Sequence, residues 1–277
     1  MRFKKLDSLF IETAKQYHKN IDYVDFFNSK VQCLNEQMYY SIHAGGLYIC
    51  KVSNIMGQYS IILYTYPVGN DSNIQLLKSK GISIRSSLIA GQKDSFGQEY
   101  LYNADKFVQM QGPEFRYHRN ILKRFKTTFE EGNSEHVADI VENWTKIRGE
   151  KHQLKLYKTV LNNLNLLHIT TTFYNGTPIG FSIVEKINDK FGIILQRLIN
   201  PTGAAYETKE PNFLLHFNDC IQHKNMVLNM GSCVGIKNMQ VSKDKLIPEN
   251  MQTINRQKGD IKITKDFFEY FKQGGEI

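Results

Sequence analysis

Apolar and polar positions are most regularly ordered between residues 168 and 198. The dipeptides Asn175-Gly176 and Asn188-Asp189 in this region are typical of tight hairpin turns. Three short segments rich in apolar and β-branched residues surround these turns and predict strands over 168–174, 178–185 and 191–198. We therefore expect an antiparallel meander in which each strand pairs with the next.

A helical spacing of apolar residues follows the meander. After a loop over 200–210, the pattern predicts a helix over 212–224, a strand over 226–230 and a second helix over 235–245. The resulting order, β-β-β-α-β-α, resembles the core of the GNAT (acetyltransferase-like) fold. In that fold the strands on either side of the central helix lie parallel and separate. The start of the helix offers free N–H groups and the positive end of its dipole to the phosphates of an acyl carrier.

The first part of the chain predicts a smaller α+β unit. Its expected elements are helices over 21–37 and 72–80 and strands over 38–42, 47–52, 59–66 and 82–89. A polar segment with two glycines predicts a loop over 91–98, and the end of a strand with a short helix is expected over 101–110. Three more helices are expected over 115–131, 136–148 and 154–166.

Composition limits the class of protein. The 277 residues are 41% hydrophobic and 12% aromatic, which supplies a core and excludes global disorder. No apolar run approaches the roughly 18 residues of a membrane span. The basic start breaks at Asp7 before any signal-peptide core, so we expect a soluble, cytoplasmic protein. The 4 scattered cysteines predict neither disulfides nor a zinc site, and the spacing of the histidines predicts no metal.

A formal net charge of +8 and a pI near 9.1 raise the expectation of a polyanionic partner. The charge is diffuse except over 115–126, a segment with no acidic residue. At 3.6 residues per turn, Arg116, Arg119, Asn120 and Lys123 fall near one face of the predicted helix. This face is either a track for the phosphates of a carrier or RNA, or an ordinary solvated surface.

Two motifs suggest a family. The first is the stretch GPEFRYHRNILKRFK over 112–126. The second is LNMG over 228–231, followed by KDKLIP over 243–248. Together they resemble the family related to the C-terminal domain of phosphatidylglycerol lysyltransferase, a tandem GNAT arrangement akin to Fem-type aminoacyltransferases. In that family a K-x-K-[FL]-x-P segment closes the second domain, and a basic Arg-Asn helix starts near the domain boundary.

The resemblance implies an α+β chain with a tandem GNAT-like (acyl-CoA N-acyltransferase) fold, in which mixed, mostly antiparallel sheets are flanked by helices. Its domains would be 1–111 and 112–277, the second with the basic helix at its entry. It implies acyl or aminoacyl transfer from acyl-CoA or aminoacyl-tRNA to an amine or hydroxyl. The chain departs from the CoA-binding pattern [QR]-x-x-G-x-[GA], because 198–205 has one glycine and Pro201 lacks an N–H. Aminoacyl-tRNA, or no donor at all, is therefore an alternative to CoA.

Candidate site residues follow from these positions. Asn229 would meet the acyl group, Tyr206 would protonate the leaving group and Glu185 would be the general base, but each also has an ordinary structural explanation. The carrier would be held by residues of the loop and the helix start: Leu198, Ile199, Asn200, Gly203, Ala204 and Asn212. Anionic parts of the substrate would be held by polar residues of the basic helix and the last motif: Arg116, Arg119, Asn120, Lys123, Lys243 and Lys245. The two lysines also suit a helix C-terminus, whose dipole favours cations.

The alternative function is that of a GNAT-fold protein without catalysis, which binds nucleic acid or a protein partner through its basic face. The net charge of +8 and the altered carrier loop favour this alternative. Salt-dependent nucleic-acid binding without donor binding would distinguish it from an acyltransferase. The acceptor and the oligomeric state are left open by the sequence.

Overall fold

The computed structural model describes residues 1–149, 151–201, 203–233 and 236–277. Contacts divide the chain into two compact units. Unit 1 comprises Met1–Glu99 and Gln252–Ile277 with Ser232 and Cys233, and unit 2 comprises Tyr100–Gly231 and Ile236–Met251. The predicted division at 111/112 differs from this one, because the chain returns to unit 1 after Met251. Thr202 of the predicted carrier loop and Gly235 at the predicted start of the last helix lie outside the described residues.

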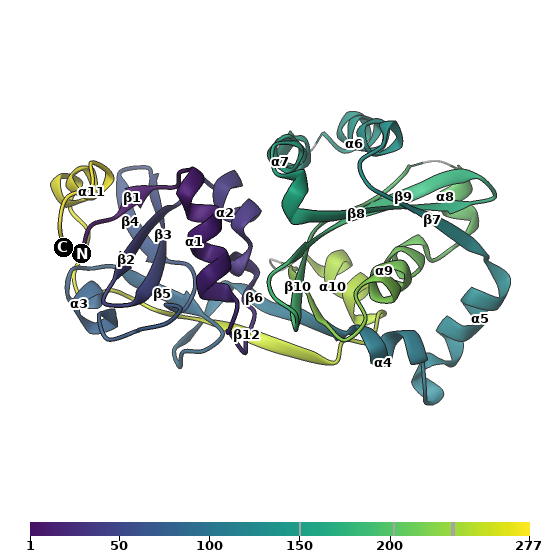
Figure 1. Cartoon of the computed structure of the whole chain (residues 1–277), viewed down its shortest axis with the longest axis horizontal. Helices are drawn as coiled ribbons and strands as arrows, with labels where there is room; N and C mark the ends of the chain where they lie inside the picture. Colours follow the sequence, from purple (N-terminus) through teal and green to yellow (C-terminus); the bar gives the residue numbers. More distant parts are fainter. Residues whose placement is uncertain (150, 202, 234–235) are drawn as a thin grey trace. The chain divides into compact units, whose positions relative to one another are not determined.

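Unit 1 is built on a mixed sheet with the strand order β1-β2-β3-β4-β5-β12-β6 (Figure 1). Its elements are β1 (Lys4–Lys5), α1 (Ser8–His18), α2 (Lys30–Asn35), β2 (Tyr39–His43), β3 (Gly46–Ile55), β4 (Gln58–Leu63), α3 (Ile74–Ser79), β5 (Ser83–Ser86), the first part of β6 (Gln92–Asn103), most of β12 (Asn250–Gln257) and α11 (Lys265–Lys272). Its apolar core joins both ends of the chain, since Phe3 and Phe271 are fully buried and their ring centroids lie 4.9 Å apart.

Several expectations for unit 1 are corrected. The helix predicted over 21–37 is confined to α2, whose start is capped by the Ser29 hydroxyl. The loop predicted over 91–98 is wrong, because most of this polar segment belongs to β6. The sequence pattern did not predict α1, β12 or α11. Strand β12 pairs with β5, more than 160 residues earlier in the chain, and such long-range pairing leaves no local signal.

Unit 2 has the strand order β6-β11-β10-β9-β8-β7. Its elements are the end of β6, α4 (Ala104–Gln109), α5 (Arg116–Arg124), β7 (Thr127–Glu131), α6 (Glu135–Arg148), α7 (Lys151–Leu161), β8 (Leu167–Tyr174), β9 (Thr177–Lys186), β10 (Phe191–Ile199), α8 (Gly203–Glu207), α9 (Pro211–Gln222), β11 (Val227–Ser232) and α10 (Lys237–Asp244). The expected meander is confirmed, since β8 pairs with β9 and β9 with β10, both antiparallel.

One predicted helix of unit 2 is divided. The helix expected over 115–131 ends at Arg124, and β7 pairs with β8 antiparallel. Phe125 is extended, with φ −113° and ψ 101°, and is buried. The β-branched pair Thr127-Thr128 follows it and favours a strand over a helix. The basic helix is therefore α5 alone, and Lys126 lies beyond its end.

Helices cover both faces of the meander, with α6 and α7 on one side and α9 on the other (Figure 1). Neighbouring residues of β10 show this division. Gln196 donates to Gln153 of α7, whereas Arg197 points to α9. Among the described residues, no helix combines the length and apolar character needed to cross a membrane.

The two units share one motif, a three-stranded meander, a helix and a strand parallel to the third strand. In unit 1 the parallel pair is β4–β5, joined through α3, and in unit 2 it is β10–β11, joined through α9. The pairing is short in both units. Only two residue pairs are formed between β4 and β5, and three between β10 and β11, which end at Ile193 and Asn229.

A buried ion pair fixes α9 on the sheet of unit 2. The Arg197 guanidinium donates to Asp219 Oδ2 at 2.5 Å, and its Nη2 lies 2.9 Å from His216 Nδ1. The side chains of Arg197 and Asp219 are 7% and 1% exposed. Burial raises the pKa of Asp219, and the charge and hydrogen bond of Arg197 oppose that rise. Burial also lowers the pKa of His216 well below its usual value, so Arg197 is the cation that faces Asp219.

We predict that Arg197→Met lowers the free energy of unfolding by about 3 to 5 kcal/mol at pH 7, because it leaves a buried carboxylate without its partner. Asp219 then acquires a still higher folded-state pKa. A carboxyl with a raised folded pKa binds more protons in the folded state, so the deficit of the variant shrinks as the pH falls from 7 to 5. Urea denaturation at several pH values measures both effects. Lys186→Met, at an exposed position, is the control, and an equal loss in both variants would contradict the prediction.

Candidate functional site

The strands β10 and β11 separate immediately after their last paired row. That row runs across three strands, because Ile193 of β10 is the Cα partner of Glu185 in β9 and of Asn229 in β11. Paired residues project to the same face of a sheet. Glu185 and Asn229 therefore flank Ile193 on one face, and all three are fully buried.

A β-bulge in β10 coincides with this separation. The register with β9 shifts between Ile194 and Gln196, so Leu195 is an extra residue. A bulge bends its strand and interrupts the ladder. From Ile194 onward, β10 stays paired with β9 but has no described residue of β11 paired on its other side, so the backbone groups on that side have no β11 partner.

The start of α9 offers few free N–H groups. Those of Lys209 and Glu210 donate to the carbonyls of Tyr206 and Thr208, and those of Phe213 and Leu214 donate to the carbonyl of Glu210. Pro211, the first residue of the helix, has none. Between 209 and 214 only the N–H of Asn212 is left, so this end of α9 is a poor phosphate cradle.

A cavity of about 190 Å³ lies at the start of α9. Its lining comes from α5, the α9 start and α10 with the residues that follow it: Tyr117, His118, Glu210, Asn212, Phe213, Ser242, Lys245 and Leu246. The Tyr117 hydroxyl donates to Glu210 Oε1 at 3.0 Å, and Lys245 Nζ lies 3.5 Å from the same oxygen. Asn212 Nδ2 donates to the Ser242 hydroxyl at 2.6 Å.

His118 forms the buried wall of this cavity and is 6% exposed. Burial is the main cause that lowers the pKa of His118, and hydrogen bonding to the backbone of Lys245 and the charge of Glu210 oppose it. The ring is therefore neutral at pH 7, and its Nδ1 has no hydrogen-bond partner among the described residues.

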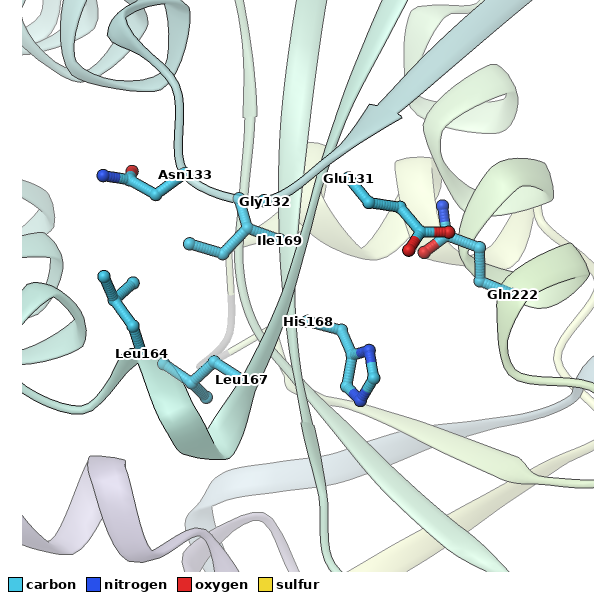
Figure 2. A pocket seen from close by; sticks show the side chains of 8 residues that line it. All are labelled: Glu131, Gly132, Asn133, Leu164, Leu167, His168, Ile169 and Gln222. Atoms are coloured by element: carbon cyan, nitrogen blue, oxygen red, sulfur yellow. The ribbon is translucent and has the colours of Figure 1, made fainter.

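A second cavity, of about 360 Å³, lies at the edge of β8, at the other end of α9. Figure 2 shows Glu131, His168 and Gln222 on one side of the strand and Leu164, Leu167 and Ile169 on the other. The Gln222 side chain already accepts from the Thr170 hydroxyl. The residues predicted for the site are absent from the lining of this second cavity. We therefore place the candidate site at the cavity of the α9 start and at the β10–β11 separation.

Comparison with solved structures identifies the fold. A conserved protein of unknown function from Bacteroides thetaiotaomicron is 13% identical, with 93% of this chain and 99% of that one covered and a TM-score of 0.75. The C-terminal domain of a putative lysylphosphatidylglycerol synthetase from Agrobacterium fabrum is 12% identical. The match covers 91% of this chain and 92% of that one, with a TM-score of 0.62. FemX is 8% identical, and the match covers 99% of this chain and 100% of that one, with a TM-score of 0.59.

A GNAT-family acetyltransferase from Colwellia psychrerythraea also matches, with a TM-score of 0.51. The chain has a tandem GNAT-like fold. The expected likeness to the lysyltransferase domain and to Fem-type proteins is thereby confirmed at the level of the fold. No family model and no curated protein matches the sequence. Identities of 8 to 13% establish the fold and leave the substrate to be argued from this chain's own residues.

The GNAT core brings some of the predicted site residues together. Asn212 and Lys245 line the cavity at the α9 start. Glu185 and Asn229 share the last paired row, where Asn229 Oδ1 accepts from the N–H of Gly231 at 2.7 Å. Tyr206 is 64% exposed on α8 and is not among the residues that line the cavity.

The predicted carrier residues have mixed surroundings. Leu198 and Ile199 complete β10, and Gly203 and Ala204 belong to α8, a short helix within the expected loop. Asn200 is buried and donates from its side chain to the carbonyl of Pro178, which ties the end of β10 to the start of β9. A structural role thus accounts for the amide nitrogen of Asn200, whereas its buried side-chain oxygen has no hydrogen-bond partner among the described residues.

Two predicted substrate residues bind backbone carbonyls. Arg119 Nη1 donates to the carbonyls of Met110 and Gly112 at the end of α4. Lys243 is 8% exposed, and its Nζ donates to the carbonyls of Met230 at 2.7 Å and Gly231 at 3.0 Å. Arg116, Asn120 and Lys123 are exposed on α5. Lys243 therefore holds α10 to the end of β11.

The sequence did not single out Tyr117, His118 or Glu210, which define the cavity. The dipeptide Glu210-Pro211 before an apolar run is a helix-start signal, and it places Glu210 at the N-cap. The approach of α5 to this point is set by tertiary packing, in which the His118 ring lies 4.6 Å from the Phe213 ring.

We predict that Lys243→Met lowers the free energy of unfolding by about 1.5 to 3 kcal/mol, because two carbonyls lose a charged donor. Lys245→Met, at an exposed position two residues away, is expected to change it by less than about 0.5 kcal/mol. Urea denaturation of both variants measures the difference. Equal stability of Lys243→Met and the wild type would contradict this structural role and favour the predicted role of Lys243 in substrate binding.

Proposed function

We propose that the chain is an acyltransferase that moves an acyl or aminoacyl group from a carrier to an amine or hydroxyl. The observation that carries this proposal is the β10–β11 separation, which begins at a bulge in β10 and beside the buried row of Glu185, Ile193 and Asn229. This arrangement gives strand backbone groups without a strand partner at the centre of unit 2. The acyltransferase-like fold of the chain agrees with it.

The proposed reaction is direct transfer. The acceptor nitrogen or oxygen attacks the carbonyl carbon, and backbone N–H groups of β10 beyond Ile193 stabilise the oxyanion. The bond from carbon to the carrier sulfur or oxygen then breaks. The proton released by the acceptor passes to that leaving atom, directly or through water, with Glu185 as the candidate base.

Both acyl-CoA and aminoacyl-tRNA are donors to be tested, and no metal enters the proposed reaction. Across the residues that the structure describes, no group of three or more His, Cys, Asp or Glu side chains is placed to hold a metal ion. The few free N–H groups at the start of α9 favour a donor whose phosphates bind elsewhere.

The test compares Leu195→Pro with Leu195→Ala, using acetyl-CoA or aminoacylated tRNA as donor and a mixture of amines as acceptor. Both variants lose the side chain, and only the proline loses the N–H. We expect kcat for acyl transfer, followed by mass spectrometry, to fall by a further 10²- to 10³-fold in Leu195→Pro. Circular dichroism confirms that both variants are folded. Equal activity in the two folded variants would exclude the Leu195 N–H, and no transfer by the wild type with either donor would refute the proposed function.

The basic surface of α5 supports a second candidate, a nucleic-acid-binding protein without catalysis. Arg116, Lys123 and Lys126 are exposed and form no ion pair with any described residue. Such side chains release counterions when they meet phosphates. An acyltransferase that uses aminoacyl-tRNA would carry the same surface.

We predict that replacing Arg116, Lys123 and Lys126 by Gln weakens RNA binding and reduces the slope of log K against log salt by about 2 to 3. Fluorescence anisotropy with a labelled RNA at several salt concentrations measures the slope. The matched control makes the same charge change at three lysines of α7: Lys151, Lys155 and Lys158. An equal effect of both triple variants would indicate a general charge effect and argue against α5 as the binding surface.

A further inference from the structure

The cavity at the start of α9 is rich in hydrogen-bond acceptors. Glu210 supplies a carboxylate whose side chain is 18% exposed. Asn212 uses its amide nitrogen for Ser242, which leaves its carbonyl oxygen directed away from that bond. The Tyr117 hydroxyl is already committed to Glu210. A ligand that complements this set has to bring donors, not acceptors.

Charge leads to the same conclusion. The N-terminus of α9 carries about half a positive charge, and the Glu210 carboxylate at its N-cap more than offsets that charge. The positive charge that remains nearby is Lys245, which is 59% exposed and 3.5 Å from Glu210, a distance typical of a weak surface pair. A phosphate entering here would meet the carboxylate, with the single N–H of Asn212 as backbone donor.

We propose that this cavity is a binding site for a primary ammonium group, and that Glu210 is its counter-ion. An ammonium group brings N–H donors, which the Glu210 carboxylate and the Asn212 carbonyl oxygen can accept. The volume of about 190 Å³ is below the range of cofactor sites, so it suits an alkylammonium chain and not a whole nucleotide. The ammonium of Lys245 occupies the rim of the site when no ligand is bound.

This site is argued from contacts of the cavity and does not depend on acyl transfer. If both proposals hold, the cavity receives the ammonium group of an amine substrate or of an aminoacyl donor. It then selects against carriers that need a diphosphate cradle at the start of α9. Glu210 is in that case a specificity residue of the transferase.

The test measures binding of 1,5-diaminopentane and of pyrophosphate to the full chain by titration calorimetry. We expect the diamine to bind and pyrophosphate not to bind. Glu210→Gln should weaken the diamine about tenfold, because a charged hydrogen-bond partner is lost. Glu207→Gln, an equal change of charge on exposed α8 outside the cavity, should leave its affinity unchanged. Thermal melts confirm that the variants fold.

Lys245→Met distinguishes a cationic ligand from an anionic one. If the site holds an ammonium, removal of the Lys245 ammonium increases the affinity for the diamine. If the site holds an anion, the same change weakens pyrophosphate, and that result overturns the proposal. Diamine affinity that is equal in wild type and Glu210→Gln also overturns it. Because these are binding measurements, failure of the ammonium site is separate from failure of acyl transfer in the Leu195 experiment.

Discussion

The parallel pairing of β10 with β11 is the constraint on which unit 2 depends. Parallel strands cannot be joined by a tight turn, so α9 has to cross the sheet to connect them. Its position is then fixed by the buried pair of Arg197 and Asp219, and the start of α9 is carried to the cavity between α5 and α10. Because the pairing is short, β10 has no β11 partner beyond Ile193, although its pairing with β9 continues. One connection thus sets both the strand separation and the neighbouring cavity.

The chemistry at the start of α9 limits what this GNAT-like unit accepts. A helix start binds phosphate when several N–H groups and an uncompensated dipole face the ligand. Here Pro211 removes one donor, the Glu210 carbonyl takes two, and the Glu210 carboxylate compensates the dipole. In the proposed ammonium site, these two adjacent residues replace the preference of a helix start for phosphate by a preference for a cation. The altered loop sequence around Pro201 is therefore one part of a larger departure from diphosphate binding.

The sequence predicts the parts of this fold whose signals are local. The turns at Asn175-Gly176 and Asn188-Asp189 define the meander, which determines the β-β-β-α-β-α order. The prediction from the sequence failed at β7 and β12, where pairing with distant strands decides the conformation. For the site, the sequence assigned Asn212 to the carrier and Lys245 to the substrate, whereas the structure has both in the lining of one cavity. The sequence also chose Lys243 and Arg119 as ligand residues. A basic residue looks alike in sequence whether it meets solvent or, as these two do, backbone carbonyls.

The two repeats of the motif differ at the point where their parallel strands part, and the proposed reaction uses the repeat of unit 2. In unit 1 the last pair is Leu63 with Ile84, and Tyr64 and Arg85 follow it. The Arg85 guanidinium lies 4.5 Å from the Tyr64 ring and 4.8 Å from the Phe27 ring, and it is 3.5 Å from Asp94. A buried cation therefore packs against a contacting pair of rings where the strands part. In unit 2 the corresponding place follows Ile193 and Asn229, next to a bulge, and the proposed reaction uses the side of β10 that has no β11 partner there.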